Sequence, residues 1–309
     1  MAEAALLLGA ALLGLCVGGF LNLVIYRLPR MMEQQWAQDV AHWQTEQTEQ
    51  MEQAQQAGQT ELDRPVEPLP QGLLGATDHA PAHTLYKLLR PRPHCPACGH
   101  VLSWWELMPV WGYVLLRGRC CACARPIGWR YPVVELVCAA LFAACAWRWG
   151  LSVSALAWAG CAACLLALAC IDADTQLLPD DLTQPLLWAG LIGAALGWTA
   201  LGLNDALWGA VAGYGLLWSV NRGFGLLTGK QGMGQGDFKL LAALGAWLGW
   251  QALLPLVLLS SGSGALIGLA RRLHGSLAQG EPLAFGPYLA LAGLVLLFFP
   301  HWGGAWWGL

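Results

Sequence analysis

Charged residues are scarce in this sequence. Asp, Glu, Lys and Arg make up 11% of its 309 residues, whereas soluble chains carry about a quarter. The shortage is uneven, because three long runs contain no charged residue: 4–26, 151–171 and 185–203. A helix needs about 20 apolar residues to cross the hydrocarbon core of a bilayer. The lack of charge therefore excludes an ordinary soluble domain and predicts an integral membrane protein.

Further apolar segments extend the pattern along the second half of the chain. Residues 133–147, 206–220 and 283–299 are candidates, and 240–270 is too long for one span and divides plausibly at Pro255. We expect an all-α polytopic membrane protein with about eight transmembrane helices. The first run lacks a preceding basic region and exceeds the apolar part of a signal peptide. We interpret it as a retained transmembrane helix; a removable signal peptide is the alternative.

The distribution of basic residues predicts an orientation. If the segments alternate across the membrane, one side receives all but one of the 16 Lys and Arg residues, and only Arg148 lies opposite. Basic residues in short flanking loops stay on the cytoplasmic side. We therefore expect both chain termini to face away from the cytoplasm.

Residues 27–131 form the only extended polar region, which we expect to be a cytoplasmic domain between a first helix (1–26) and a membrane core (132–309). Its first part, 31–64, has apolar residues at helical spacing and predicts an amphipathic helix. These residues are Met32, Trp36, Val40 and Trp43. The helix could lie on the bilayer, pack on the domain or be solvated. The proline-rich stretch 65–93 predicts an irregular connection.

Two CxxC pairs follow, Cys95 with Cys98 and Cys120 with Cys123. Four thiolates in two such pairs are typical of a small zinc ribbon, because zinc takes four soft ligands in a tetrahedron. A reducing cytoplasm disfavours disulfides, so unliganded thiols are the alternative to zinc. Cys121 falls outside the CxxC spacing, and we expect His94 and His100 to lie beside the ligands or on the surface.

The remaining cysteines lie within apolar segments. Thiols in that setting pack like Ala or Ser at close helix contacts, so we expect no metal or redox role for them, despite the CxxC spacing of one pair. They are Cys16, Cys138, Cys145, Cys161, Cys164 and Cys170.

Acidic residues gather at two apolar segment ends. Asp172 and Asp174 end the run 151–171, in a loop that holds four acids and no base. A glycine-rich stretch, 229–236, leads into Asp237 at the start of an apolar helix. Ionised carboxylates are costly near hydrocarbon and require a reason. The glycines fit neither a Walker loop nor a dinucleotide fingerprint.

Both acidic loops are predicted on the same side of the membrane at similar depth. Two close carboxylates share a proton, so that one can deprotonate water while the other polarises a carbonyl group. This is aspartyl-protease chemistry. A solvated loop and an ordinary helix cap are the simpler interpretations of the two acids. A transporter or proton relay using the same carboxylates, and a membrane scaffold with a zinc module, are the rival functions.

In this order the motifs resemble one family. The sequence is similar to the type IV prepilin peptidases across nearly its whole length, on five features. They are 18–29 (GGFLNLVIYRLP), the CxxC pairs with Arg117-Gly-Arg119, 129–135 (WRYPVVE), the acidic loop ending in Leu178-Pro179-Asp180, and Gly234-Gln-Gly236-Asp237. Gly19 departs slightly from the commoner Ser.

The resemblance implies two catalytic aspartates, Asp237 and Asp172, with Asp174 as a competing assignment for the second. Gly234 and Gly236 then belong to the catalytic loop. It also implies cleavage of prepilins or pseudopilins after a Gly, where a basic leader meets a hydrophobic helix at the cytoplasmic face of the bacterial inner membrane. Methylation of the new N-terminus by S-adenosylmethionine is implied as well, without residues for the methyl donor.

The expected cofactors are structural Zn²⁺ and S-adenosylmethionine, and the expected partners are substrate and membrane lipid, without nucleic acid. Four acids of the polar region could attract a basic leader or form a solvated face: Glu61, Asp63, Glu67 and Asp78. We expect Asn22 to bridge helices by hydrogen bonds, and Glu135 to snorkel or to pair with Arg130. The identity of the pilin, the role of zinc and the oligomeric state are left open.

Overall fold

The computed structural model describes residues 2–56, 92–229, 233–274 and 284–299. These residues form helices and loops without a β-strand; the nearest approach is two isolated β-bridges, His94 with Val101 and Arg119 with Pro126. The prediction of an all-α chain is confirmed for this part of the protein. The chain divides into two compact units: Met1–Tyr26 with His94–Leu309, and Arg27–Pro93.

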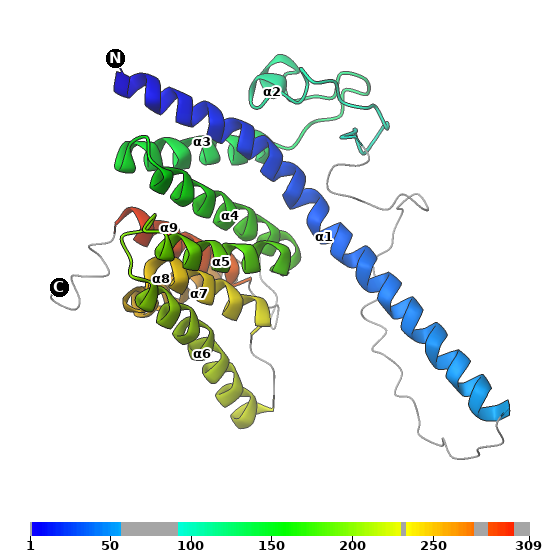
Figure 1. Ribbon diagram of the computed structural model, residues 1–309. Helices are drawn as coiled ribbons and strands as arrows, with labels where there is room; N and C mark the ends of the chain where they lie inside the picture. The colour runs from blue at the N-terminus through cyan, green and yellow to red at the C-terminus, as the bar shows by residue number, and fades with distance from the viewer. Residues whose placement is uncertain (1, 57–91, 230–232, 275–283, 300–309) are drawn as a thin grey trace. The chain divides into compact units, whose positions relative to one another are not determined.

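Figure 1 shows the helices in chain order. They are α1 (Ala2–Gln56), α2 (Trp111–Leu115), α3 (Arg130–Trp149), α4 (Val153–Thr175), α5 (Asp180–Ala195), α6 (Leu203–Thr228), α7 (Gln235–Leu248), the 3₁₀ turn η2 (Trp250–Ala252), α8 (Leu253–Leu273) and α9 (Gly286–Phe298).

Four of the described helical stretches are long and apolar enough to cross a membrane. They lie within Glu3–Met51, Arg130–Trp149, Val153–Thr175 and Trp250–Leu273, and α9 is a shorter apolar helix. The chain is therefore a multi-pass membrane protein by length and composition. The expected number of about eight spans is not confirmed, because α5 and α7 are short and α6 is not among the four.

The second unit begins at Arg27 with the continuation of α1, which contains Pro29. The predicted amphipathic helix is confirmed as far as Gln56, and Trp36, Val40 and Trp43 on it are exposed. The acidic residues expected to attract a leader lie outside the described residues, as do Lys230 and Gly232 of the glycine-rich stretch.

Helix α7 is the buried centre of the first unit. From Asp237 to Trp247 every residue except Lys239 is buried, and α5, α6 and α9 pack around it. A helix that is apolar all round needs such a setting. The indole N–H of Trp247 donates to the carbonyl of Leu186 on α5 at 2.8 Å, which satisfies the polar end of this buried side chain.

Close backbone contact holds α6 against α7. A Cβ added at Gly209 of α6 would lie 2.1 Å from the carbonyl oxygen of Gly245 of α7, and one at Gly213 would lie 2.7 Å from that of Leu241. Small residues spaced by four let membrane helices approach this closely. We call the close contact of Gly209 and Gly213 with α7 the glycine seam. It sets the position of α7, which carries Asp237.

The break within the run 240–270 differs from the expected position. Helix α7 ends before Gly249, whose φ of 84° lies in the left-handed region, and Pro255 sits in the first turn of α8. Proline is tolerated in the first turn, because no helical carbonyl awaits its missing N–H. Glycine therefore divides the run and proline does not.

Candidate functional site

Asp172 lies in the last turn of α4 and is 4% exposed. The backbone N–H of Gly286, at the start of α9, donates to its Oδ2 at 2.9 Å. The N-terminus of a helix favours negative charge through its free N–H groups and its dipole. The fold therefore offers this buried carboxylate a stabilising partner from a distant segment.

Asp237 lies in the first turn of α7 and is 8% exposed. The charge of the Asp172 carboxyl group acts on that of Asp237. The two acids lie on different helices, one in the last turn of α4 and the other in the first turn of α7. Both are buried, so the solvated-loop interpretation of Asp172 does not describe the fold.

The loop before Asp237 is packed directly on the acidic loop. A Cβ at Gly236 would lie 2.7 Å from Cβ of Leu178, so a larger residue would push the two loops apart. Gly234 caps α7 with an extended backbone, and the N–H of Met233 donates to Oδ1 of Asn221 on α6 at 3.1 Å. These contacts fix the position of the first turn of α7.

Asp174, the competing assignment, has different surroundings. Its carboxylate is 43% exposed and pairs with the guanidinium of Arg130, which also donates to the carbonyl of Cys170. The half-exposed carboxylate of Asp174 and the guanidinium of Arg130 therefore form an ion pair between α4 and α3. Asp180 is likewise paired, accepting from Nζ of Lys239 at 2.7 Å.

Glu135 corrects one expectation. It neither snorkels nor pairs with Arg130; its carboxylate accepts from the N–H of Val110 at 2.7 Å and from the amide of Asn22 at 3.3 Å. The expected bridging role of Asn22 is confirmed, because its amide also donates to the carbonyl of Tyr131 at 3.0 Å. This group ties α1, α3 and the loop before α2 together.

The four predicted cysteine ligands form one cluster. Sγ of Cys95 lies 3.8 Å from Sγ of Cys123, and Sγ of Cys98 lies 4.0 Å from Sγ of Cys120. Zinc–sulfur bonds of about 2.3 Å in a tetrahedron give sulfur–sulfur edges of about 3.8 Å. The donor set therefore fits a tetrahedral thiolate metal site.

Backbone N–H groups stabilise the thiolate form of Cys95 in this cluster. Hydrogen bonds from the N–H groups of Ala97 and Cys98 lower the pKa of Cys95 to about 6. A thiolate is the form that binds metal. Cys121 lies apart from the four, with its Sγ 3.3 Å from Nε2 of His100, and within α4 Cys161 is buried among apolar neighbours.

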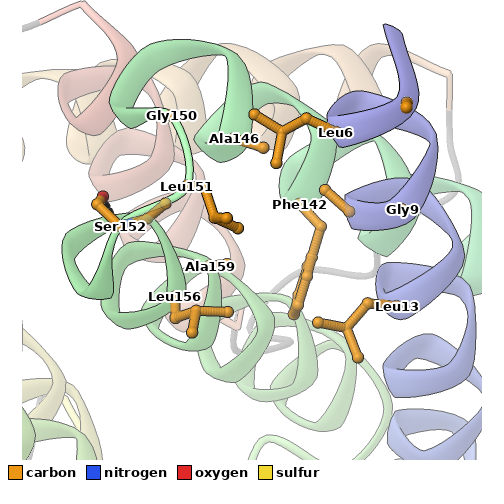
Figure 2. A pocket seen from close by; sticks show the side chains of 13 residues that line it. Leu6, Gly9, Leu13, Phe142, Ala146, Gly150, Leu151, Ser152, Leu156 and Ala159 are labelled. Carbon is orange, nitrogen blue, oxygen red and sulfur yellow. Dashed lines mark hydrogen bonds between the residues drawn. The ribbon is translucent and has the colours of Figure 1, made fainter. Parts of the chain in front are cut away.

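An apolar pocket of about 350 Å³ lies between α1, α3 and α4 (Figure 2). Leu13, Phe142, Leu156 and Ala159 are among its lining residues, and Ser152 supplies the only side-chain hydroxyl. Ala159 is about 20 Å along α4 from the acidic pair, at 1.5 Å per residue. The pocket has no groups for hydrolysis, so the acidic pair is the stronger candidate for an active site.

Two family models match the chain in succession. The bacterial peptidase A24 N-terminal domain matches residues 12–149, and the type IV leader peptidase family matches residues 159–269. The chain belongs to the type IV leader peptidase family. The second match contains both buried aspartates, and the first contains the cysteine cluster. The resemblance drawn from the sequence motifs is confirmed.

Relatives from this family match over nearly the full length. A prepilin leader peptidase/N-methyltransferase from Burkholderia pseudomallei (strain 1026b) is 46% identical over 94% of this chain and 84% of its own. Proteins of the same name from Stutzerimonas stutzeri and Pseudomonas aeruginosa are 45% and 44% identical, each over 97% of this chain and 91% of theirs. No solved structure matches the chain significantly.

Sequence reasoning missed several features of this leader peptidase site. The Gly286 amide is 114 residues from Asp172 in the chain, and no local pattern marks it. The partners of Asp174 and Asp180 were also missed, because Arg130 and Lys239 lie 44 and 59 residues away from them in the chain.

Proposed function

We propose that this chain is a membrane-embedded aspartyl endopeptidase that removes the basic leader from prepilins or pseudopilins. The cut falls after a Gly at the cytoplasmic face of the membrane, and the new N-terminus is then methylated. The observation that carries the proposal is the pair of buried, interacting carboxyl groups of Asp172 and Asp237, in a chain of the type IV leader peptidase family.

The chemistry needs one proton shared by the two acids. Two carboxylates at close range in a buried site keep both charges only at high cost, so the pair holds one proton. The ionised member takes a proton from water as the water oxygen attacks the scissile carbonyl carbon. The protonated member donates its proton to the carbonyl oxygen. Collapse of the tetrahedral species breaks the C–N bond, and the amine leaves with a proton from the pair.

Asp172 is the member we assign as ionised when water attacks. Its Oδ2 accepts from the Gly286 N–H at the start of α9, which favours its charged form. Among the described residues no backbone N–H donates to Asp237 in this way, and we assign the proton to it. Gly234 and Gly236 keep the loop before it compact enough to bring the two acids together.

The test is cleavage of a prepilin-like substrate by purified protein. Asp172→Asn and Asp237→Asn should each lower the cleavage rate at least about 10³-fold, because each removes one half of the acid–base pair. Asp174→Asn is the matched control and should retain most activity, since that side chain pairs with Arg130. Equal metal content and thermal stability in all three variants would separate chemistry from folding.

Loss of cleavage in Asp174→Asn with retention in Asp172→Asn would transfer the second catalytic role to Asp174. Normal cleavage in both Asp172→Asn and Asp237→Asn would reject the protease assignment. The transporter alternative would then be tested by ion flux in the same variants; no feature of the described site favours it now.

The cysteine cluster is proposed to bind structural Zn²⁺. Cys95, Cys98, Cys120 and Cys123 supply four sulfur donors at spacings that suit a closed tetrahedral site. Zinc held there would cross-link the two knuckles. Chelation should therefore loosen the two knuckles first.

The remaining assignments rest on family membership and charge distribution. The relatives' name includes N-methyltransferase, and we extend that activity to this chain with S-adenosylmethionine as the donor, without assigning residues to it. We propose a bacterial inner-membrane location with a first helix at 1–26, a cytoplasmic domain at 27–131 and a membrane protease core at 132–309. Lipid and prepilin substrates are the proposed partners.

A further inference from the structure

A second group of metal-ligating side chains lies beside the four-cysteine cluster. Nε2 of His100 is 3.3 Å from Oε2 of Glu106 and 3.3 Å from Sγ of Cys121. The three donor atoms all lie within 4.8 Å of one another. None of them belongs to the CxxC pairs, and neither the family matches nor the proposed reaction gives them a role.

The fold holds each donor in place independently. His100 lies at the end of the first knuckle, where its carbonyl accepts from the N–H of Cys95 at 2.8 Å. The Glu106 side chain is 2% exposed, and its carboxylate accepts from the N–H of Ser103 at 2.6 Å. Cys121 sits within the second knuckle. The three therefore meet because the two knuckles and the turn between them are folded together.

The spacing of the donors suits a cation. Bonds of about 2.0 Å to nitrogen and oxygen and about 2.3 Å to sulfur give tetrahedral edges of about 3.3 to 3.6 Å. Both distances from Nε2 of His100, to Oε2 of Glu106 and to Sγ of Cys121, are 3.3 Å and fall at the lower end of that range. A nearly buried carboxylate also needs positive charge or further donors to offset its desolvation, and a divalent ion would supply that charge.

We propose that His100, Glu106 and Cys121 form a second site for a borderline divalent cation such as Zn²⁺. Imidazole, carboxylate and thiolate together favour zinc or cobalt over the hard ions Mg²⁺ and Ca²⁺. Three protein donors leave a fourth position for water. Cys121 is exposed, so water reaches that position and the ion exchanges faster than one held by four thiolates.

The experiment is a metal titration of the full-length protein in detergent. Metal is first removed with a chelator under reducing conditions. Zn²⁺ is then restored by equilibrium dialysis at a fixed free concentration, and the bound ion is counted by mass spectrometry. We expect two ions per wild-type chain, one in Cys121→Ser, one in Glu106→Gln, and two in the control Cys16→Ser.

Titration with Co²⁺ gives a second reading that does not depend on counting bound ions by mass spectrometry. The sulfur-to-cobalt charge-transfer absorbance should rise to two equivalents in the wild-type protein, and the second step should vanish in Cys121→Ser. A single ion per wild-type chain overturns the proposal, and so do two ions that survive both substitutions. The assay involves no cleavage, so its result is independent of the catalytic assignment.

Discussion

At the scale of single residues, the acidic pair depends on a glycine in another helix. Gly286 donates its N–H to Oδ2 of Asp172, and a Cβ at that position would lie 2.7 Å from the same oxygen and 3.0 Å from Cγ. Both contacts are with the side chain assigned to catalysis. The amide can therefore reach the carboxylate only because the residue carrying it has no side chain.

Gly286→Ala should lower the cleavage rate about 10-fold to 10³-fold with a smaller effect on KM, because it displaces Asp172 without touching the substrate. Steady-state kinetics on a prepilin-like substrate measures the effect. Gly160→Ala is the matched control. Gly160 lies on the same helix as Asp172, and a Cβ added there would have no atom within 4 Å. Unchanged kcat in Gly286→Ala would show that the hydrogen bond is not needed for the reaction.

The thiol of Cys95 allows a pH-dependent prediction. Hydrogen bonds from the N–H groups of Ala97 and Cys98 lower its pKa to about 6, so in the metal-free protein its thiolate is present above that pH and lost below it. Alkylation of Cys95 by iodoacetamide, followed by peptide mass spectrometry, should rise with a midpoint near pH 6. Alkylation of an unperturbed cysteine has its midpoint at about pH 8.5.

The metal-loaded protein is the control for that experiment, because a coordinated thiolate is shielded from alkylation. Equal rates with and without metal would contradict metal binding by Cys95. A midpoint at the ordinary cysteine value would show that the backbone hydrogen bonds do not form.

At the scale of elements, the glycine seam between α6 and α7 positions Asp237. Gly209→Ala would place Cβ 2.1 Å from the carbonyl oxygen of Gly245, and backbone atoms cannot rotate away from such a contact. The helices must separate, and overpacking of this kind costs about 1–3 kcal/mol. We expect a lower Tm together with slower cleavage, since α7 carries the catalytic residue.

Gly215→Ala on the same helix should leave both quantities unchanged, because a Cβ there has open space. Thermal unfolding in detergent and a cleavage assay on the same samples measure the two effects. A stable Gly209→Ala variant would mean that α6 and α7 are farther apart than the structure has them.

The sequence predicted the elements better than their partners. Apolar runs marked most of the helices, and Asn22 was correctly expected to bridge two of them, because a polar group in an apolar run must find a partner. The partner of Glu135 was missed, since the N–H of Val110 reaches it through a loop whose course has no periodicity. The break at Gly249 was placed at Pro255, because a left-handed φ leaves no sign in the sequence beyond a glycine.

At the scale of the whole molecule, the open question is how the short helices cross the bilayer. Helix α7 has 14 residues, about 21 Å at 1.5 Å per residue, whereas the hydrocarbon core is about 30 Å thick. From Asp237 to Trp247 every residue of it except Lys239 is buried, and α5, α6 and α9 pack around it. A short helix inside a bundle can still connect the two sides, because its neighbours complete the span.

If α7 crosses, the loops alternate in a defined way. In the proposed orientation, the turns at 150–152, 196–202 and 249–252 then lie outside the cytoplasm. The acidic loop at 176–179, the loop before α7 and the basic end of α8 lie inside, with Arg271 and Arg272. If α7 does not cross, every later loop changes side, and this basic pair falls on the outer face against the bias of the rest of the chain.

Alkaline phosphatase, which folds only outside the cytoplasm, distinguishes these two arrangements when fused after Gly150, Gly197, Gln176 or Leu273. We expect activity for the first two fusions and none for the last two, with green fluorescent protein fusions giving the reverse result as the control. Activity after Leu273 would show that α7 does not span. Activity after Gln176 would move the acidic pair to the outer face, where it could not meet a cytoplasmic leader.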